Sequence, residues 1–133
     1  MAHPRPDVAP PLKVLVVDAD ERIRDSLAGL LGIGRRCVVV GSASDPAHGL
    51  EIARETEPDV VVVDPRLPEL EAGRAFIEQL HALSPGIRVL ALHRSEAEEA
   101  DDAGCGADAA IRKTFRPREL VDAVVAAGRR SPH

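Results

Sequence analysis

Short unbroken apolar runs alternate with segments of helical spacing along the chain, and this alternation constrains the fold more than any other feature. Continuous apolar runs are typical of strands that are buried on both faces of a parallel sheet. The runs that predict strands are Leu12–Val17, Cys37–Val40, Val60–Val63, Val89–Leu92 and, more weakly, Ala109–Ile111.

The segments between these runs have the spacing of amphipathic helices. Asp45 followed by Pro46 predicts a helix start, because Asp caps a helix and Pro fits its first turn. Ser95 and Glu98 have capping-box spacing for a short helix that reaches about Ala103. Apolar faces of the other helices are predicted at Ile23, Leu27, Leu30 and Leu31, at Phe76, Ile77, Leu80 and Leu83, and at Leu120, Ala123, Val124 and Ala127.

The strict order of strand and helix predicts an α/β fold, a doubly wound (βα)5 unit with helices on both faces of a parallel five-stranded sheet. We expect one domain over residues 12–128. The Pro-rich residues 1–11 are expected to form a disordered leader, and residues 129–133 a disordered tail. Five residues after Gly128 leave no room for an output domain, so we expect a stand-alone unit.

Composition excludes several classes of function. No segment approaches the ~20 apolar residues that span a bilayer, and the leader does not resemble a signal peptide, so we expect a cytoplasmic protein. A net charge of −5 argues against direct binding of nucleic acid, which needs a basic surface. Cys37 and Cys105 match no metal-ligand spacing and are expected to be reduced thiols.

Charged side chains follow the predicted strands at the edge where ligands bind in open α/β sheets. Asp18 and Asp20 follow the first strand, Asp64 the third, His93 the fourth and Lys113 the fifth. With the first and third strands adjacent at the centre, Asp18 and Asp64 should face each other across a small pocket that Lys113 reaches.

Two carboxylates and an ammonium group suit phosphoryl chemistry with Mg²⁺, a cation that prefers oxygen ligands. One carboxylate would attack phosphorus while the metal and the lysine neutralise the phosphoryl oxygens. The alternative is structural: Asp18 and Asp20 would then cap the first helix, and Asp64 would begin a turn before Pro65.

Three motifs, VLVVDAD (Val14–Asp20), PDVVVVDPRLP (Pro58–Pro68) and GADAAIRKTF (Gly106–Phe115), resemble the receiver domain of bacterial response regulators. The resemblance, to the CheY-like superfamily of two-component signalling, runs from about Leu12 to Gly128. It is nearest to receivers attached to LuxR-type DNA-binding domains. It implies a flavodoxin-like sheet with strand order 2-1-3-4-5.

The resemblance also implies residue roles. Asp64 would accept a phosphoryl group from a histidine kinase or phosphotransfer protein, and Lys113 would contact that group. Asp18, Asp64 and the backbone carbonyl of Arg66 would hold Mg²⁺, with Asp20 as a further candidate ligand. A downstream protein would bind the face formed by helix 4, strand 5 and helix 5, and the chain would be a monomer or a weak homodimer.

The sequence departs from the receiver pattern around this pocket. Ala19 stands where the second acidic residue usually lies, so we expect weakened Mg²⁺ binding. His93 stands in place of the Thr or Ser that ends strand 4, and Ala110 in place of an aromatic residue on strand 5. Either the His93 ring fills the space of the missing aromatic side chain, or it points to solvent from a loop.

These departures leave two functions open. The first is a stand-alone receiver that accepts phosphate on Asp64 and signals by protein contacts. The second is a pseudo-receiver, an interaction module that works without phosphorylation. An enzyme is not expected beyond self-phosphorylation and self-dephosphorylation, because an aspartyl phosphatase usually has a general acid two residues after its nucleophile, and Arg66 occupies that position.

Overall fold

The computed structural model describes residues 10–102 and 104–129 of the chain, and the expectations for residues 1–9 and 130–133 lie outside them. Strands and helices alternate as the sequence predicts. The strands are β1 (Leu12–Val17), β2 (Cys37–Ala43), β3 (Val60–Val63), β4 (Arg88–His93) and β5 (Ala109–Arg112). The helices are α1 (Glu21–Leu31), α2 (Pro46–Thr56), α3 (Leu70–Leu83), α4 (Glu96–Asp102) and α5 (Pro117–Gly128), with a 3-10 turn η1 (Ile33–Arg35).

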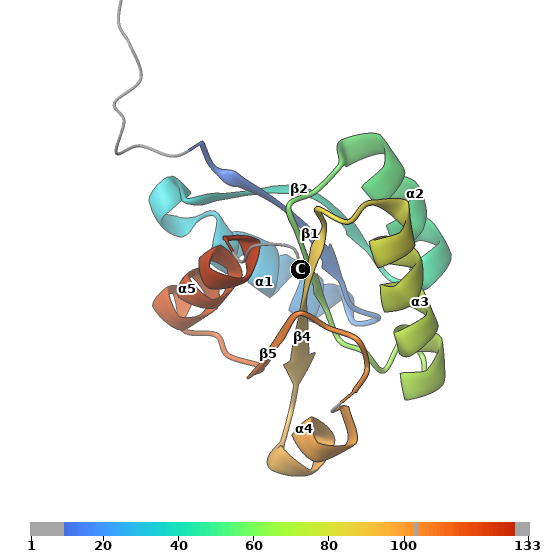
Figure 1. Ribbon diagram of the computed structural model, residues 1–133. Coiled ribbons are helices and arrows are strands. Elements are labelled where there is room, and N and C mark those ends of the chain that lie inside the picture. The colour runs from blue at the N-terminus through green and yellow to red at the C-terminus, as the bar shows by residue number, and fades with distance from the viewer. Residues whose placement is uncertain (1–9, 103, 130–133) are drawn as a thin grey trace, which may run out of the picture.

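The five strands form one parallel sheet in the order β2-β1-β3-β4-β5, which confirms the predicted topology. Helices α1 and α5 cover one face of the sheet, and α2 and α3 cover the other (Figure 1). Val17 pairs with Val63 across β1 and β3, so these two strands end at the same level. The residues that follow them therefore meet at the carboxyl edge of the sheet.

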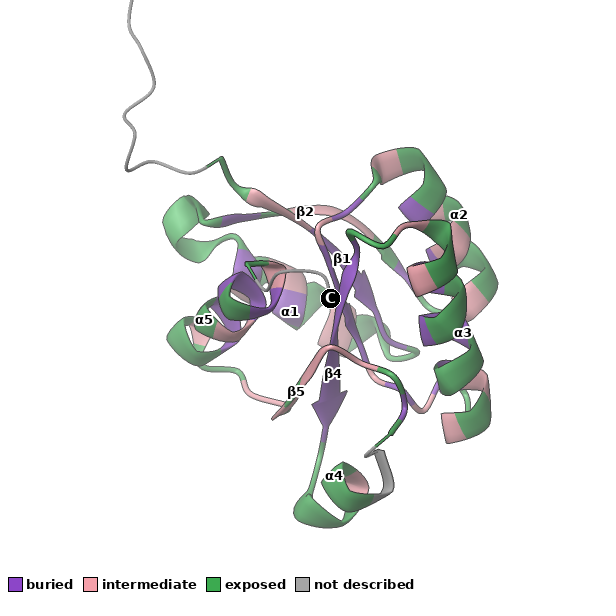
Figure 2. Ribbon diagram, viewed as in Figure 1, coloured by how far each residue is buried: buried purple, intermediate pink, exposed green. Residues whose placement is uncertain are grey.

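The core is aliphatic and lies in two layers, one on each face of the sheet. All four residues of β3 and all six of β4 are buried, as expected for central parallel strands (Figure 2). Phe76 is the one large aromatic side chain in this core among the described residues, and it packs beneath Gly49 of α2. A Cβ atom on Gly49 would come within 2.9 Å of the Phe76 ring, so the small residue lets α2 and α3 approach.

Strand β2 is longer than predicted, because it continues past Val40 through Gly41, Ser42 and Ala43. These residues have weak strand propensity, so the local pattern did not indicate them. The pairing shifts by one residue after Val14 opposite Val39, and Leu15 then pairs with Gly41. Pairing with β1, which resumes after this shift, therefore extends the strand where local sequence does not.

Two expectations about helices need correction. Leu83, expected on the apolar face of α3, is 37% exposed, because it is the last residue of that helix and lines an open hollow. In α4, Glu98 N–H donates to Ser95 Oγ at 3.2 Å as predicted. The Glu98 carboxylate, however, accepts from the backbone N–H of Arg94 rather than from Ser95, so the capping box is displaced by one residue.

Both cysteines are buried and unpaired. Burial raises the pKa of the Cys37 thiol, although the neighbouring Arg36 acts in the opposite direction. None of the described helices has the length and apolar content that crossing a membrane requires.

Candidate functional site

Asp18, Asp64 and Lys113 meet at the carboxyl edge of the sheet. Lys113 Nζ lies 2.9 Å from Asp18 Oδ2 and 3.0 Å from Asp64 Oδ2. The side chains of all three are 12% exposed or less. One ammonium group therefore bridges two carboxylates that follow β1 and β3.

Backbone hydrogen bonds fix the direction of both carboxylates. Asp18 Oδ1 accepts the backbone N–H of Asp20 at 2.9 Å, and Asp64 Oδ1 accepts that of Arg66 at 2.9 Å. The backbone N–H of Lys113 donates to the His93 carbonyl at 2.7 Å, which extends the pairing of β5 with β4 beyond the strand. Each carboxylate is thus left with one oxygen, Oδ2, turned toward the lysine.

The electrostatics of this trio favour its charged form. Burial alone would lower the pKa of Lys113, but its contacts with Asp18 and Asp64 outweigh burial and raise the pKa above its ordinary value. Lys113 therefore stays positively charged at neutral pH. A permanent ammonium group beside two carboxylates can neutralise an incoming anion that carries several oxygens.

An open cleft of about 540 Å³ gives access to these side chains. Asp18, Asp64 and Lys113, all largely buried, line it. Phe115, which is 53% exposed, lies in its wall after β5. The remaining lining residues are Ala19, Asp20, Ile23, Arg66, Pro68 and Arg94.

The oxygen atoms in the cleft suit Mg²⁺, but the side chains that supply them are few. Asp20 lies in the cleft, yet its Oδ1 caps α1 by accepting the backbone N–H of Arg22 at 2.8 Å. Ala19 is exposed at the cleft and contributes no side-chain oxygen. No group of three or more metal-binding side chains converges among the described residues. Two carboxylates still fit Mg²⁺, which usually keeps several waters when one or two carboxylates bind it.

His93 does not point to solvent from a loop, so that alternative is wrong. It is the last residue of β4 and is only 3% exposed. Its Nε2 lies 3.7 Å from Glu99 of α4, and its Nδ1 is buried without a hydrogen-bond partner. Ala110 lies on the same face of β5 but is exposed, so the ring does not fully cover the position of the missing aromatic side chain.

Sequence reasoning missed a charged cluster at the mouth of the cleft. Glu98 of α4 binds Arg94, with Nη2 2.9 Å and Nε 3.0 Å from Oε2. Arg66 Nη1 lies 3.8 Å from Glu98 Oε1, and both arginines line the cleft. The spacing of Arg94 and Glu98, four residues apart with opposite charges, was the available signal.

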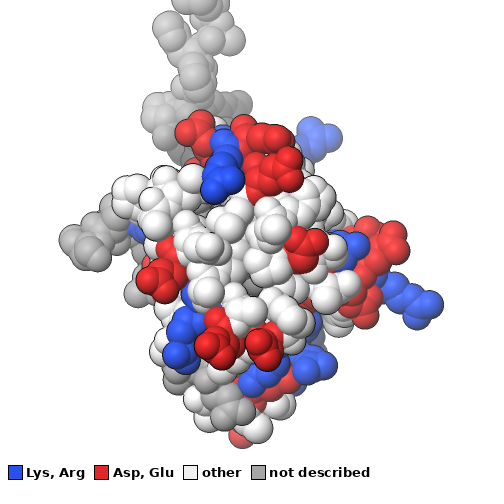
Figure 3. Space-filling model, turned by 90° about the vertical axis from the view of Figure 1, so that its right-hand side faces the viewer, with Lys and Arg blue, Asp and Glu red and all other residues white. Residues whose placement is uncertain are grey.

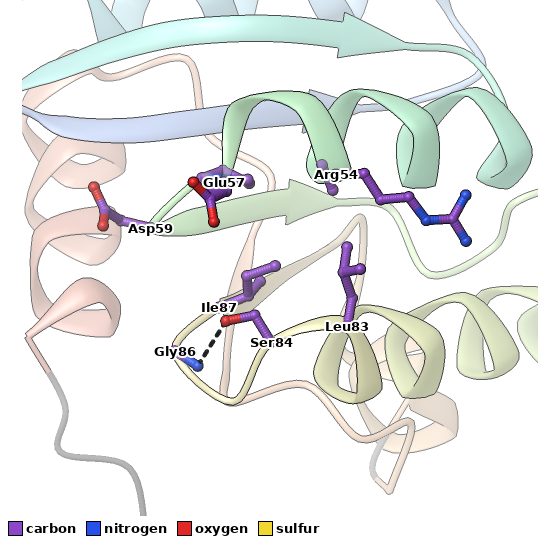
Figure 4. A pocket seen from close by; sticks show the side chains of 9 residues that line it. Arg54, Glu57, Asp59, Leu83, Ser84, Gly86 and Ile87 are labelled. Carbon is purple, nitrogen blue, oxygen red and sulfur yellow. Dashed lines mark hydrogen bonds between the residues drawn. The ribbon is translucent and has the colours of Figure 1, made fainter.

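Two other hollows among the described residues do not bring two aspartates and a lysine together. One of about 250 Å³ lies at the opposite end of β3, between the last residues of α2 and α3 (Figure 4). Its Asp59 accepts the backbone N–H of Lys13 at 2.8 Å, a structural contact. On the face formed by α2 and α3, acidic and basic side chains are mixed around an uncharged centre, unlike the basic surface that nucleic-acid binding needs (Figure 3).

Comparison with known proteins agrees with this geometry. Residues 14–125 match the family described as the response regulator receiver domain. The response regulator domain of CheB from Thermotoga maritima superposes with a TM-score of 0.78 at 28% identity, covering 92% of this chain and 99% of that one. A LuxR-family response regulator from Aurantimonas gives 0.75 at 26% identity, covering 89% and 85%.

Curated relatives are longer proteins. A protein-glutamate methylesterase/protein-glutamine glutaminase of Anaeromyxobacter dehalogenans is 35% identical over 99% of this chain and 40% of its own length. The transcriptional regulatory protein LiaR of Bacillus subtilis is 30% identical over 91% of this chain and 58% of its length. The chain thus spans about half the length of these relatives. Its fold, its carboxyl-edge cleft and these matches together place it in the receiver-domain family of two-component response regulators.

Proposed function

We propose that this chain accepts a phosphoryl group on Asp64 from a histidine kinase or phosphotransfer protein and signals through protein contacts. The observation that carries the proposal is the bridge from Lys113 Nζ to the Oδ2 atoms of Asp18 and Asp64. It holds a carboxylate nucleophile, a second acid and a permanent cation around one accessible cleft.

The chemistry requires a bond between an Asp64 oxygen and phosphorus while the bond from phosphorus to the donor atom breaks. Asp64 suits this role because the Arg66 N–H fixes Oδ1 and leaves the carboxylate in one orientation. Lys113 would move from its ion pair with Asp64 to the phosphoryl oxygens, whose negative charge it neutralises. Asp18 remains beside it and keeps the lysine charged.

Magnesium would be held by Asp18 and Asp64, with the Arg66 carbonyl as a third oxygen. The ion supplies further positive charge for the phosphoryl oxygens when it is bound. Asp20 is a weaker candidate, because one of its oxygens caps α1. The absence of a side-chain oxygen at Ala19 supports weak binding of the metal.

The downstream surface is proposed on α4, β5 and α5, next to the cleft. Ala110 and Arg112 of β5 are exposed there, and the α4 side chains around Glu98 are exposed as well. A partner protein bound to this face would respond to structural changes that begin at the cleft. We propose a monomer or a weak homodimer in the cytoplasm, with no enzymatic activity beyond phosphorylation and dephosphorylation of its own aspartate.

Acetyl phosphate with Mg²⁺ tests the phosphoacceptor directly. Intact-mass spectrometry should show one phosphoryl adduct on the wild-type chain and on Asp25→Asn, a control at an exposed residue of α1. Asp64→Asn should show no adduct. An adduct that persists in Asp64→Asn would assign the phosphoryl group to another residue.

The second candidate is the pseudo-receiver, which the missing carboxylate at Ala19 favours. It predicts no adduct on any variant at saturating Mg²⁺. It also predicts that a partner isolated with the wild-type chain binds Asp64→Asn with unchanged affinity. Equal partner affinity together with an absent adduct would replace the phosphoacceptor proposal with this one.

A further inference from the structure

Arg94 is placed between the cleft and α4. It follows β4, lines the cleft with Asp64, and binds the Glu98 carboxylate through its backbone N–H (2.8 Å), Nε (3.0 Å) and Nη2 (2.9 Å). Its side chain is 64% exposed, whereas that of Glu98 is only 16% exposed. Glu98 is therefore the anchored partner, and the guanidinium is the accessible one.

Helix α4 has little else to hold it. It has seven residues, and its apolar side chains Ala97 and Ala100 are both exposed. Glu98 is the one side chain described in α4 that is not exposed, and the helix stands away from the sheet (Figure 2). Two longer approaches also link it to the sheet, Glu99 to His93 at 3.7 Å and Glu96 to Arg112 at 3.8 Å. A helix this short depends on such contacts, because its own hydrogen bonds do not stabilise it.

A phosphoryl group on Asp64 would compete with Glu98 for Arg94. It brings a charge of about −1.5 to −2 and oxygens that a guanidinium binds in a bidentate manner. Hydrogen bonding to Glu98 raises the pKa of Arg94, and the charges of Asp64 and Asp18 add to that increase. The Arg94 guanidinium therefore already interacts electrostatically with the Asp64 carboxylate, the group that would be phosphorylated.

We propose that Arg94 is a further phosphoryl-binding residue, which Glu98 holds until Asp64 is modified, and that its transfer to the phosphoryl group frees α4. The inference rests on the proposed function of Asp64. It gives the cleft a connection to α4 that uses neither a hydroxyl at His93 nor an aromatic side chain at Ala110. Arg66, 3.8 Å from the same carboxylate, is placed to follow Arg94.

Hydrogen exchange in the unmodified chain tests the role of Glu98 without any phosphodonor. Glu98→Gln should speed exchange of the α4 backbone amides about tenfold. The matched control is Glu96→Gln in the same helix, whose carboxylate is 89% exposed and 3.8 Å from Arg112. Equal exchange rates of the α4 amides in the two variants would overturn the claim that Glu98 stabilises this helix.

Beryllofluoride with Mg²⁺, followed by fluorine NMR, tests the role of Arg94. Arg94→Ala should weaken the adduct about tenfold relative to wild type, and Arg22→Ala, at an exposed position on α1, should not. Adduct formation should raise wild-type α4 exchange to the level of Glu98→Gln. Equal adduct affinity in wild type and Arg94→Ala overturns this inference alone. A wild-type chain that forms no adduct overturns the proposed function of Asp64, and with it the phosphoryl contact of Arg94.

Discussion

The charge of Lys113 stabilises the folded chain as well as preparing the site. Its side chain is 12% exposed and bridges Asp18 and Asp64, so Lys113→Met would leave two carboxylates facing each other without a cation. We expect a cost of about 2 kcal/mol in the free energy of unfolding at pH 7. Urea unfolding followed by circular dichroism measures it, since the chain lacks Trp and Tyr.

The pH dependence of that cost follows from the raised pKa of Lys113. A group whose pKa is higher in the folded state contributes its full stability below the unfolded value, about 10.4 for lysine. The contribution is lost as the pH rises through the raised folded pKa. The difference between wild type and Lys113→Met should thus be constant from pH 7 to about 10 and then shrink. A difference that already shrinks near neutral pH would contradict this assignment.

Gly73 permits the close approach of α3 to the loop that follows Asp64. A Cβ atom there would lie 1.5 Å from the Pro65 carbonyl oxygen, a backbone atom that cannot turn aside. We expect Gly73→Ala to lower the free energy of unfolding by about 3 kcal/mol and to reduce phosphorylation of Asp64. Gly29→Ala on α1 is the matched control, because its Cβ atom would meet nothing within 4 Å. This substitution should raise the free energy of unfolding by about 0.5–1 kcal/mol, since Ala is the better helix former. Equal effects at both glycines would contradict the steric argument.

At the scale of elements, variants of Asp20 test one of the two roles that the sequence left open, that of a helix cap rather than a metal ligand. As the N-cap of α1, it accepts the Arg22 N–H at 2.8 Å. Asp20→Asn keeps that acceptor and should change stability by a few tenths of a kcal/mol, whereas Asp20→Ala should cost about 1 kcal/mol. Thermal unfolding of both variants without divalent ions measures the effect. A cost for Asn as large as for Ala would show that the charge of Asp20, rather than its cap, matters.

Elements whose signal lies in their own residues were predictable. Val60–Val63 and Asp45-Pro46 specify a buried strand and a helix start locally, and both lie where expected. Gly41–Ala43 extend β2 only because β1 offers pairing, and Leu83 is exposed because α3 ends over a hollow. These outcomes depend on neighbours that a single segment does not encode.

The same division applies to the candidate site. The meeting of Asp18, Asp64 and Lys113 follows from strand order, because parallel strands bring their carboxyl ends to one edge. The bond between Arg94 and Glu98 depends on the rotamers of two long side chains, which spacing alone does not fix. The burial of His93 depends on the residues that surround the end of β4, Glu99 of α4 among them, and these come from other segments of the chain.

At the scale of the whole molecule, Mg²⁺ should stabilise the fold in proportion to how tightly the cleft binds it. An ion that binds only the folded chain adds RT ln(1 + [Mg²⁺]/Kd) to the free energy of unfolding. With two carboxylates and no oxygen from Ala19, we expect a Kd of about 10 mM and a gain of about 0.4 kcal/mol at about 10 mM Mg²⁺. Sodium chloride at equal ionic strength corrects for screening.

Restoring an acid in the cleft should strengthen this linkage. Ala19 is exposed, so Ala19→Asp adds a carboxylate beside Asp18 without displacing a neighbour. Without metal the added negative charge should lower stability slightly, and with about 10 mM Mg²⁺ a tenfold tighter site should add about 1.4 kcal/mol. Ala19→Asn, similar in shape but uncharged, should respond as wild type does. If Ala19→Asp and Ala19→Asn respond equally to Mg²⁺, the second acid is not what limits metal binding, and the two carboxylates of the wild-type cleft already set its affinity.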